Sequence, residues 1–126
     1  MSEGGSRLYG GAGDDSFFLG TGDRIVGGAG DDLIFAGVGG DNVITGGSGA
    51  DEFWIANAET PLQPNTITDF TVGEDVIGIG IVGTSFGDLA LSEADGTTAI
   101  ALGGNTLALL LGVPVSSLSA TNFVFA

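Results

Sequence analysis

The sequence predicts an all-β protein: a right-handed parallel β-roll with two nine-residue repeats per turn, followed by a small, mostly antiparallel β cap. Three observations predict it. A nine-residue phrase recurs in the N-terminal part, glycine accounts for 25 of the 126 residues, and short β-forming runs separated by turn residues fill the C-terminal part. A fixed short period is typical of a solenoid, in which each repeat packs on its neighbours.

The phrase has three clear copies, GGAGDDSFF from Gly10, GGAGDDLIF from Gly27 and GGSGADEFW from Gly46. Two weaker copies lie between them: Leu19–Val26, which is one residue short, and Ala36–Ile44, after which Thr45 is left over as an insertion. Upstream, Glu3–Tyr9 is in register as another copy, with Ser6 where the aspartate belongs. A coil that begins in mid-phrase suggests that Met1 is a cloning start inside a longer natural array.

Each copy combines a glycine turn with a three-residue strand. Glycine adopts positive φ without steric cost, and a large apolar residue among β-formers predicts a short strand with one side chain pointing inward. The predicted inward centres are Phe17, Ile25, Ile34, Val43 and Phe53. Because two copies complete one turn of the coil, alternate copies stack on the same edge.

This stacking brings carboxylates together. Asp15, Asp32 and Asp51 should line up on one edge, and Asp23 and Asp41 on the other, at the spacing of neighbouring strands, roughly 5 Å. Bare carboxylates at that distance repel, whereas a hard divalent cation between the turns would accept them together with backbone carbonyls. Calcium suits such oxygens; zinc prefers nitrogen or sulfur, and the chain has neither histidine nor cysteine.

The phrase resembles the calcium-binding nonapeptide GGxGxDxUx of the repeats-in-toxin (RTX) family. That resemblance implies that calcium is bound by the aspartate side chain and by carbonyls from the first, second and fourth positions. On the strong edge these are Gly10, Gly11, Gly13, Asp15, Gly27, Gly28, Gly30, Asp32, Gly46, Gly47, Gly49 and Asp51. On the weak edge they are Gly20, Gly22, Asp23, Ala36, Gly37, Gly39 and Asp41. We expect two strong calcium sites on the first edge and one or more weaker ones on the second.

The chain divides in sequence into the array, residues 1–55, and a cap with a secretion-signal region, residues 56–126. Ala56–Asn65 contains two prolines and should be a loop leaving the roll. Beyond it we expect β-rich runs and two hairpins, a short helical turn after Pro114 and a last strand. These are Thr66–Phe70, Asp75–Ile81, Leu89–Ser92, Thr97–Leu102, Thr106–Leu111, the helical turn Val115–Ala120, and Asn122–Ala126.

The segment around Asp69 is similar to the TDF-x-x-GED-x-I stretch that closes many RTX arrays. The resemblance implies that Asp69 completes the last calcium shell; a turn or cap role is the open alternative. Glu74 and Asp75 are expected to be solvated turn residues. The C-terminal tail is similar to the short hydrophobic tails of proteins exported by type I secretion, although any terminal strand would look alike.

The charge is lopsided, with 16 acidic residues against only Arg7 and Arg24, a formal net charge of −14. Nucleic acid and anionic membranes are poor partners for such a surface. No apolar run approaches the roughly 20 residues that cross a bilayer, so membrane insertion is not expected. The N-terminus lacks a signal-peptide pattern.

Phe18, Phe35 and Trp54 should form an aromatic ladder on one outer face, with Leu33 beside them. Packing between the strands is one explanation. The alternative is a contact face covered by another domain or by a second copy of the chain, that is, self-association.

The RTX resemblance, taken with these features, implies a non-enzymatic calcium-binding module, the C-terminal part of a larger secreted protein of a Gram-negative-type bacterium. Its partners would be calcium, the upstream domain of that protein and the type I secretion machinery. Adjacent acids such as Asp14 and Asp15 point to opposite sides of a strand, which argues against a glycosidase pair. The alternative function is an adhesin-like solenoid that binds a cell surface or carbohydrate through Phe18, Phe35 and Trp54.

Overall fold

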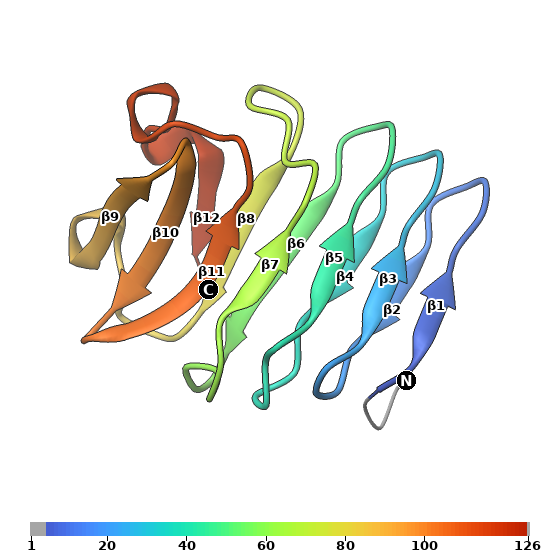
Figure 1. The fold of residues 1–126 in the computed structure, drawn as a ribbon, viewed down its shortest axis with the longest axis horizontal. Helices are drawn as coiled ribbons and strands as arrows, with labels where there is room; N and C mark the ends of the chain where they lie inside the picture. Colours follow the sequence, from blue (N-terminus) through green and yellow to red (C-terminus); the bar gives the residue numbers. More distant parts are fainter. Residues whose placement is uncertain (1–4, 126) are drawn as a thin grey trace.

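The computed structural model describes residues 5–125 as a flattened coil with two facing sheets (Figure 1). The seven-stranded sheet contains, in spatial order, β1 (Arg7–Tyr9), β3 (Arg24–Val26), β5 (Val43–Thr45), β7 (Asn65–Ile67), β11 (Asn105–Leu110), β10 (Thr97–Leu102) and β9 (Leu89–Ala94). The five-stranded sheet contains β12 (Phe123–Phe125), β8 (Val76–Gly80), β6 (Glu52–Asn57), β4 (Leu33–Phe35) and β2 (Ser16–Phe18). Met1 and the first two residues of the upstream copy lie outside the described residues.

Successive short strands alternate between the two sheets, so the chain completes one coil for every two copies of the phrase. Arg7 pairs with Arg24 and Arg24 with Val43 in parallel register on one sheet, while Ser16 pairs with Leu33 on the other. The parallel β-roll predicted from the sequence is confirmed. Ser6 continues the upstream copy in register, because its main chain bonds to the following coil at Asp23 and Arg24.

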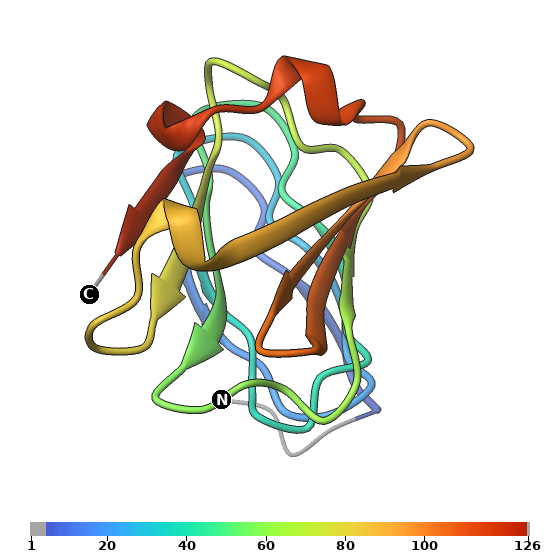
Figure 2. The same ribbon diagram turned by 90° about the vertical axis from the view of Figure 1, so that its left-hand side faces the viewer.

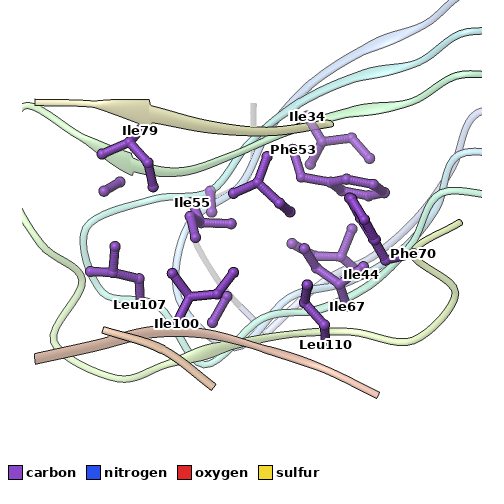
Figure 3. Close-up of a cluster of buried hydrophobic side chains, with 14 of the residues drawn as sticks. Ile34, Ile44, Phe53, Ile55, Ile67, Phe70, Ile79, Ile100, Leu107 and Leu110 are labelled. Carbon is purple, nitrogen blue, oxygen red and sulfur yellow. The ribbon is translucent and has the colours of Figure 1, made fainter. Parts of the chain in front are cut away.

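The middle residue of each three-residue strand points into the coil. Ile25, Ile34 and Phe53 are buried as predicted, and Phe17, near the N-terminal end, is half-buried. The predicted centre Val43 is wrong: Ile44 is fully buried in its place, because the extra residue of that copy lies in the preceding turn and not at Thr45. Figure 3 shows Ile34, Ile44 and Phe53 meeting Ile67 and Phe70 in one continuous apolar interior.

The coil continues beyond residue 55. β7 pairs in parallel with β5, and β8 with β6, so the loop after β6 carries the chain across to the opposite sheet and does not leave the roll. The expectation of an exit loop at Ala56–Asn65 is therefore wrong. The repeat pattern of the sequence ends at residue 55, but each sheet contains strands from before and after that position.

The cap has the predicted antiparallel hairpins, in which β10 pairs with β9 and with β11. It also extends the roll, because β11 is parallel to β7 and β12 is parallel to β8. In place of one helical turn after Pro114, two separate 3₁₀ turns, Val115–Ser117 and Ala120–Asn122, carry the chain across one edge between the sheets (Figure 2). A third, Phe86–Asp88, precedes β9. Within residues 5–125 the structure has no helix long and apolar enough to span a membrane.

The aromatic ladder is present on the outer face of the five-stranded sheet. The rings of Phe18 and Phe35 stack with centroids 5.0 Å apart, and those of Phe35 and Trp54 with centroids 6.3 Å apart. Beyond Trp54 the aromatic ladder ends at Gly78, where a Cβ would collide with the indole ring. The indole N–H donates to Glu52 Oε1 at 2.6 Å, which fixes the ring against the sheet.

Candidate metal centre

Four aspartates form a column along one edge of the coil, each in the turn just before a strand of the five-stranded sheet. The main-chain N–H of Asp15 donates to Asp32 Oδ1 at 2.9 Å, and that of Asp32 to Asp51 Oδ1 at 2.9 Å. The N–H of Asp51 donates to Asp75 Oδ1 at 2.8 Å. We call these residues the carboxylate column. One oxygen of each of the last three aspartates therefore holds the turn before it.

The second oxygen is the unusual feature of the column. Oδ2 of Asp15, Asp32 and Asp51 is buried and has no hydrogen-bond partner. Leaving a buried polar atom without a partner costs roughly 1 to 3 kcal/mol, and more for a charged group. Asp75 differs, because its Oδ2 accepts from the N–H of Thr71 at 2.8 Å. Three successive turns thus each present an acceptor that the protein itself leaves unsatisfied.

Glycine makes room around these oxygens. A Cβ on Gly10 would lie 2.6 Å from Asp15 Oδ2 and 2.5 Å from the Gly27 carbonyl oxygen. A Cβ on Gly27 would lie 2.5 Å from Asp32 Oδ2 and 2.7 Å from the Gly46 carbonyl oxygen. These glycines have ordinary φ, so what they supply is space. The unsatisfied oxygens of Asp15 and Asp32 therefore each share a small space with a carbonyl oxygen of the next turn.

The next glycine of each turn, in contrast, is required by its backbone. Gly11, Gly28 and Gly47 have φ of 79°, 89° and 88°, which a residue with a side chain rarely adopts. A Cβ on Gly28 would also collide with the Gly11 carbonyl of the previous coil. The turns thus pack backbone on backbone, with a carbonyl oxygen of one coil against the glycine of the next.

The chemistry of this donor set fits a hard cation. Within residues 5–125 no three acidic side chains converge on one point, so the column offers a mixture of single carboxylates and main-chain carbonyls. Calcium accepts six to eight such oxygens in a flexible shell, whereas a zinc site uses nitrogen or sulfur ligands that this sequence lacks.

The comparisons with known proteins agree with this chemistry. The sequence model of the RTX calcium-binding nonapeptide repeat, in four copies, matches residues 2–23 and 21–53. The N-terminal coils are an RTX calcium-binding array. No curated protein matches the sequence. With its RTX repeats and parallel coils, the chain is a calcium-binding β-roll module.

Similar solved structures share the whole fold and not only the RTX array. The AlgE6R3 subunit of the Azotobacter vinelandii mannuronan C5-epimerase aligns with a TM-score of 0.64 and 29% identity, over 93% of this chain and 81% of that one. The AlgE6R2 subunit of the same enzyme aligns with a TM-score of 0.63 and 25% identity, over 94% and 92%. The extracellular lipase LipA of Serratia marcescens aligns at 0.52 and 19% identity over 93% of this chain and 20% of its own, and shows the fold alone.

The structure brings the RTX positions of the strong edge together. Gly10, Gly27 and Gly46 lie beside the unsatisfied oxygens of Asp15, Asp32 and Asp51, and Gly11, Gly28 and Gly47 stack on one another from coil to coil. The fourth-position glycines stack in the same way, because a Cβ on Gly30 would collide with the Gly13 carbonyl and one on Gly49 with that of Gly30. That these oxygens bind calcium is our proposal.

The weak edge does not have the predicted alignment. Asp41 is exposed, with φ of 58°, and Asn42 occupies the position that stacks on Asp23. The reason is the extra residue in the turn from Ala36 to Asp41, which shifts the register so that Arg24 pairs with Val43. Asp23 Oδ2 accepts a hydrogen bond from the N–H of Gly20 at 2.7 Å. The shortened turn brings these two groups close enough for this bond.

The turn that closes the array departs from expectation at one residue. Asp69 accepts hydrogen bonds from the N–H groups of Gly46 and Gly47, both at 2.8 Å, as expected if it caps the turn. Its role as a calcium ligand remains a proposal. Glu74 is exposed as expected. Asp75 is only 2% exposed, so the expectation that it is solvated is wrong. Asp75-Val76-Ile77 repeats the pattern of Asp51-Glu52-Phe53, a signal that identifies it as the next member of the column.

Burial opposes ionisation of the column. Loss of hydration on burial is the main cause that raises the pKa of Asp51 to about 7; the nearby carboxylates of Asp75, Asp32 and Asp69 contribute, and the hydrogen bond from the Asp32 N–H opposes them. Burial likewise raises the pKa of Asp32 and of Asp75. Removing water and crowding like charges favour the neutral acid. Burial therefore favours the protonated form of Asp32, Asp51 and Asp75 in the absence of metal, whereas a bound cation requires the ionised carboxylates.

Proposed function

We propose that the chain is a calcium-dependent folding module, the C-terminal part of a larger secreted protein whose export and folding it aids. The observation that carries the proposal is the set of buried, unpartnered oxygens of Asp15, Asp32 and Asp51. Each lies beside the first glycine of its own turn, and those of Asp15 and Asp32 also lie beside a carbonyl oxygen of the adjacent coil. We expect the two slots between the turns of Gly10, Gly27 and Gly46 to be the principal calcium sites.

In this mechanism the residues of the column oppose folding until their charge is balanced. The carboxylates stack one above another, and the glycine turns lose much conformational entropy on folding. Bound calcium supplies the positive charge that the unpartnered oxygens lack. Ordinary extracellular calcium modules have dissociation constants of roughly 10⁻⁴ to 10⁻³ M, so at millimolar calcium each site would stabilise the folded state by about 1 kcal/mol. Successive coils share ligands, which makes the response cooperative.

The test is a calcium titration of the whole chain, monitored by far-ultraviolet circular dichroism and light scattering. Strand signal should rise with calcium and stay low with the same concentration of magnesium, which prefers octahedral geometry and retains its water. Full strand signal after removal of all divalent ions, or an equal response to magnesium, would refute the proposal.

The secretion part of the proposal is supported by the C-terminal strand. Phe123 is 6% exposed, pairs with Ile77 and packs its ring 5.2 Å from that of Phe86. A tail held in this way could be read by an exporter only before folding, which fits a chain that folds in the calcium-rich exterior. Loss of export after deletion of residues 122–126, in a bacterium that carries a type I exporter, would support it. Unchanged export would remove the tail from the proposal.

The alternative of a sugar-binding aromatic face is weakened by the ring geometry. A sugar stacks on the face of a ring, but the rings of Phe18 and Phe35 lie face to face at an interplanar angle of 5°. Trp54 is covered by Phe35 and by the Gly78 backbone. Stacking therefore covers both faces of Phe35 and much of Trp54, as expected for packing between strands. Unchanged Trp54 fluorescence with candidate sugars is the expected result.

A second candidate function is favoured by the opposite face. The chain's only basic residues are Arg7 and Arg24, which lie opposite each other in the register of β1 and β3. With Tyr9 they line a surface hollow of about 320 Å³. Two adjacent guanidinium groups suit carboxylates. Because both AlgE6 subunits come from a mannuronan epimerase, we propose oligomannuronate as the ligand to test. Arg7→Gln with Arg24→Gln should abolish binding, with a neutral dextran as control. Binding that survives both changes would exclude this face.

A further inference from the structure

The two edges of the coil satisfy their polar side chains in different ways. On the edge opposite the carboxylate column, the aligned residues are Asp23, Asn42 and Asn65, all fully buried. The backbone relation is the same, because the N–H of Asp23 donates to Asn42 Oδ1 at 2.8 Å and the N–H of Asn42 to Asn65 Oδ1 at 3.3 Å. We call these three residues the amide column.

The difference lies in the second atom of each side-chain head. Where Asp32 and Asp51 place an unpartnered oxygen, Asn42 places an NH₂ group. This group donates to the Gly20 carbonyl at 3.1 Å and to Asn65 Oδ1 at 3.0 Å. Asn65 in turn donates from its amide nitrogen to the Leu107 carbonyl at 3.4 Å. The amide column therefore carries its own donors from coil to coil and into the cap.

The acceptors that Asn42 joins are of the same kind as those gathered in the carboxylate column. One is a glycine carbonyl of the preceding turn and the other is a side-chain oxygen of the following turn. On the carboxylate edge a carbonyl and a carboxylate oxygen converge around Gly10 and around Gly27, with no donor between them. The neutral NH₂ group of Asn42 thus occupies, between coils, the role that the other edge leaves for a cation.

We propose that Asn42 makes the second edge independent of calcium and confines calcium to the carboxylate column, an inference that rests on the proposed function. Asn42 is thus a specificity-determining residue: its amide joins the coils directly where a carboxylate would require a metal ion. The module consequently has one edge that responds to calcium and one that does not. The weaker calcium sites expected on the second edge from sequence are then absent as long as Asn42 is present.

The principal test is Asn42→Asp, which changes NH₂ to oxygen with almost no change in shape. In chelator, the variant should have less strand signal than the wild type, and calcium should restore that signal. The variant should also bind about one additional calcium ion per chain, because the change creates a facing pair of carboxylates. Equilibrium dialysis with elemental analysis gives the stoichiometry, and circular dichroism gives the folding. Asn105→Asp, the same change at an exposed hairpin residue, is the matched control and should leave both values unchanged.

The reciprocal variant is Asp32→Asn, which introduces an amide into the carboxylate column. It should bind less calcium than the wild type and retain more strand signal in chelator. If Asn42→Asp keeps the wild-type stoichiometry and chelator response, or stays unfolded at saturating calcium, the inference is overturned, because the amide then serves shape and not charge balance. Undiminished calcium binding by Asp32→Asn would also overturn it. Failure of the proposed function is distinct: wild-type chain would bind no calcium at all.

Discussion

The main-chain N–H of Asp51 donates to Oδ1 of Asp75 at 2.8 Å, across 24 residues of sequence. This bond joins the last glycine-rich repeat to a segment that no longer has the repeat pattern. It shows that the carboxylate column extends one coil beyond the RTX array. Because Asp75 uses its other oxygen for Thr71, it ends the column with both oxygens satisfied.

Replacing Asp75 should therefore destabilise the protein even in excess calcium. Asp75→Ala leaves the N–H groups of Asp51 and Thr71 without their partner, at a cost of roughly 1 to 3 kcal/mol for a buried group. Urea denaturation at saturating calcium measures the loss. Glu74→Ala, at the exposed neighbour, is the control and should stay within about 0.5 kcal/mol of the wild type. Equal effects of the two changes would contradict a structural role for Asp75.

Position along the column should decide the cost of losing a carboxylate. Asp32 lies between Asp15 and Asp51, whereas Asp15 is the first member of the column. Asp32→Ala should abolish calcium-induced folding more thoroughly than Asp15→Ala, because it affects the slots on both sides. Calcium titrations by circular dichroism compare the midpoints. Equal midpoints for the two variants would refute the ranking.

The first glycine of each turn should be required for its space. In Gly27→Ala the new Cβ would lie 2.5 Å from Asp32 Oδ2, within the space where carboxylate and carbonyl oxygens converge. We expect at least a tenfold weaker calcium midpoint, equivalent to about 1.4 kcal/mol. Gly87→Ala is the control, since nothing lies within 4 Å of its Cβ and its φ is ordinary. A wild-type midpoint for Gly27→Ala would show that the slots lie elsewhere.

Acid should partly replace calcium in the metal-free protein. The pKa of Asp51 is raised to about 7 in the folded state, from an ordinary value of 3.8. Between these values the folded state binds more protons at Asp51 than the unfolded chain does, so the contribution of Asp51 to stability is full below about pH 4 and is lost as the pH rises towards 7. Calcium should reverse the trend, because it binds the ionised form.

The far-ultraviolet strand signal of metal-free protein, measured from pH 5 to pH 8, tests this prediction. It should fall as the pH rises, and Asp51→Asn should flatten the dependence because the titrating group is gone. A wild-type slope in Asp51→Asn would assign the effect to the general charge of the chain.

Strand positions were predictable from sequence wherever the phrase had its full length. Phe53 and Ile34 are central because an apolar residue follows aspartate at a fixed distance, and the stacking of Phe18 on Phe35 follows from the same spacing. Ile44 was missed because a glycine turn can absorb an extra residue on either side of the strand without a change in composition. Only the pairing of Arg24 with Val43 locates it.

The candidate site was predictable for the same reason and to the same extent. The identity of the aspartates with an unsatisfied oxygen followed from the three full copies of the phrase. Asn42 and Asn65 could not be found from the phrase because it specifies aspartate at their position, although Asn42-Val43-Ile44 and Asn65-Thr66-Ile67 have the same arrangement of polar and apolar residues. Asp75 was missed because its preceding residues form no glycine pair.

The parallel pairing of β11 with β7 ties distant parts of the chain into one cooperative unit. Asn65 reaches Leu107 across 42 residues, and the interior side chains of the cap, such as Ile100, pack in the same cluster as Ile44. A fragment ending at residue 55 would expose the inner surface of its final coil to water, with no partner strand on either sheet. Truncation at the last recognisable repeat would therefore remove β7 and β8, the strands that pair with the final coil of the array.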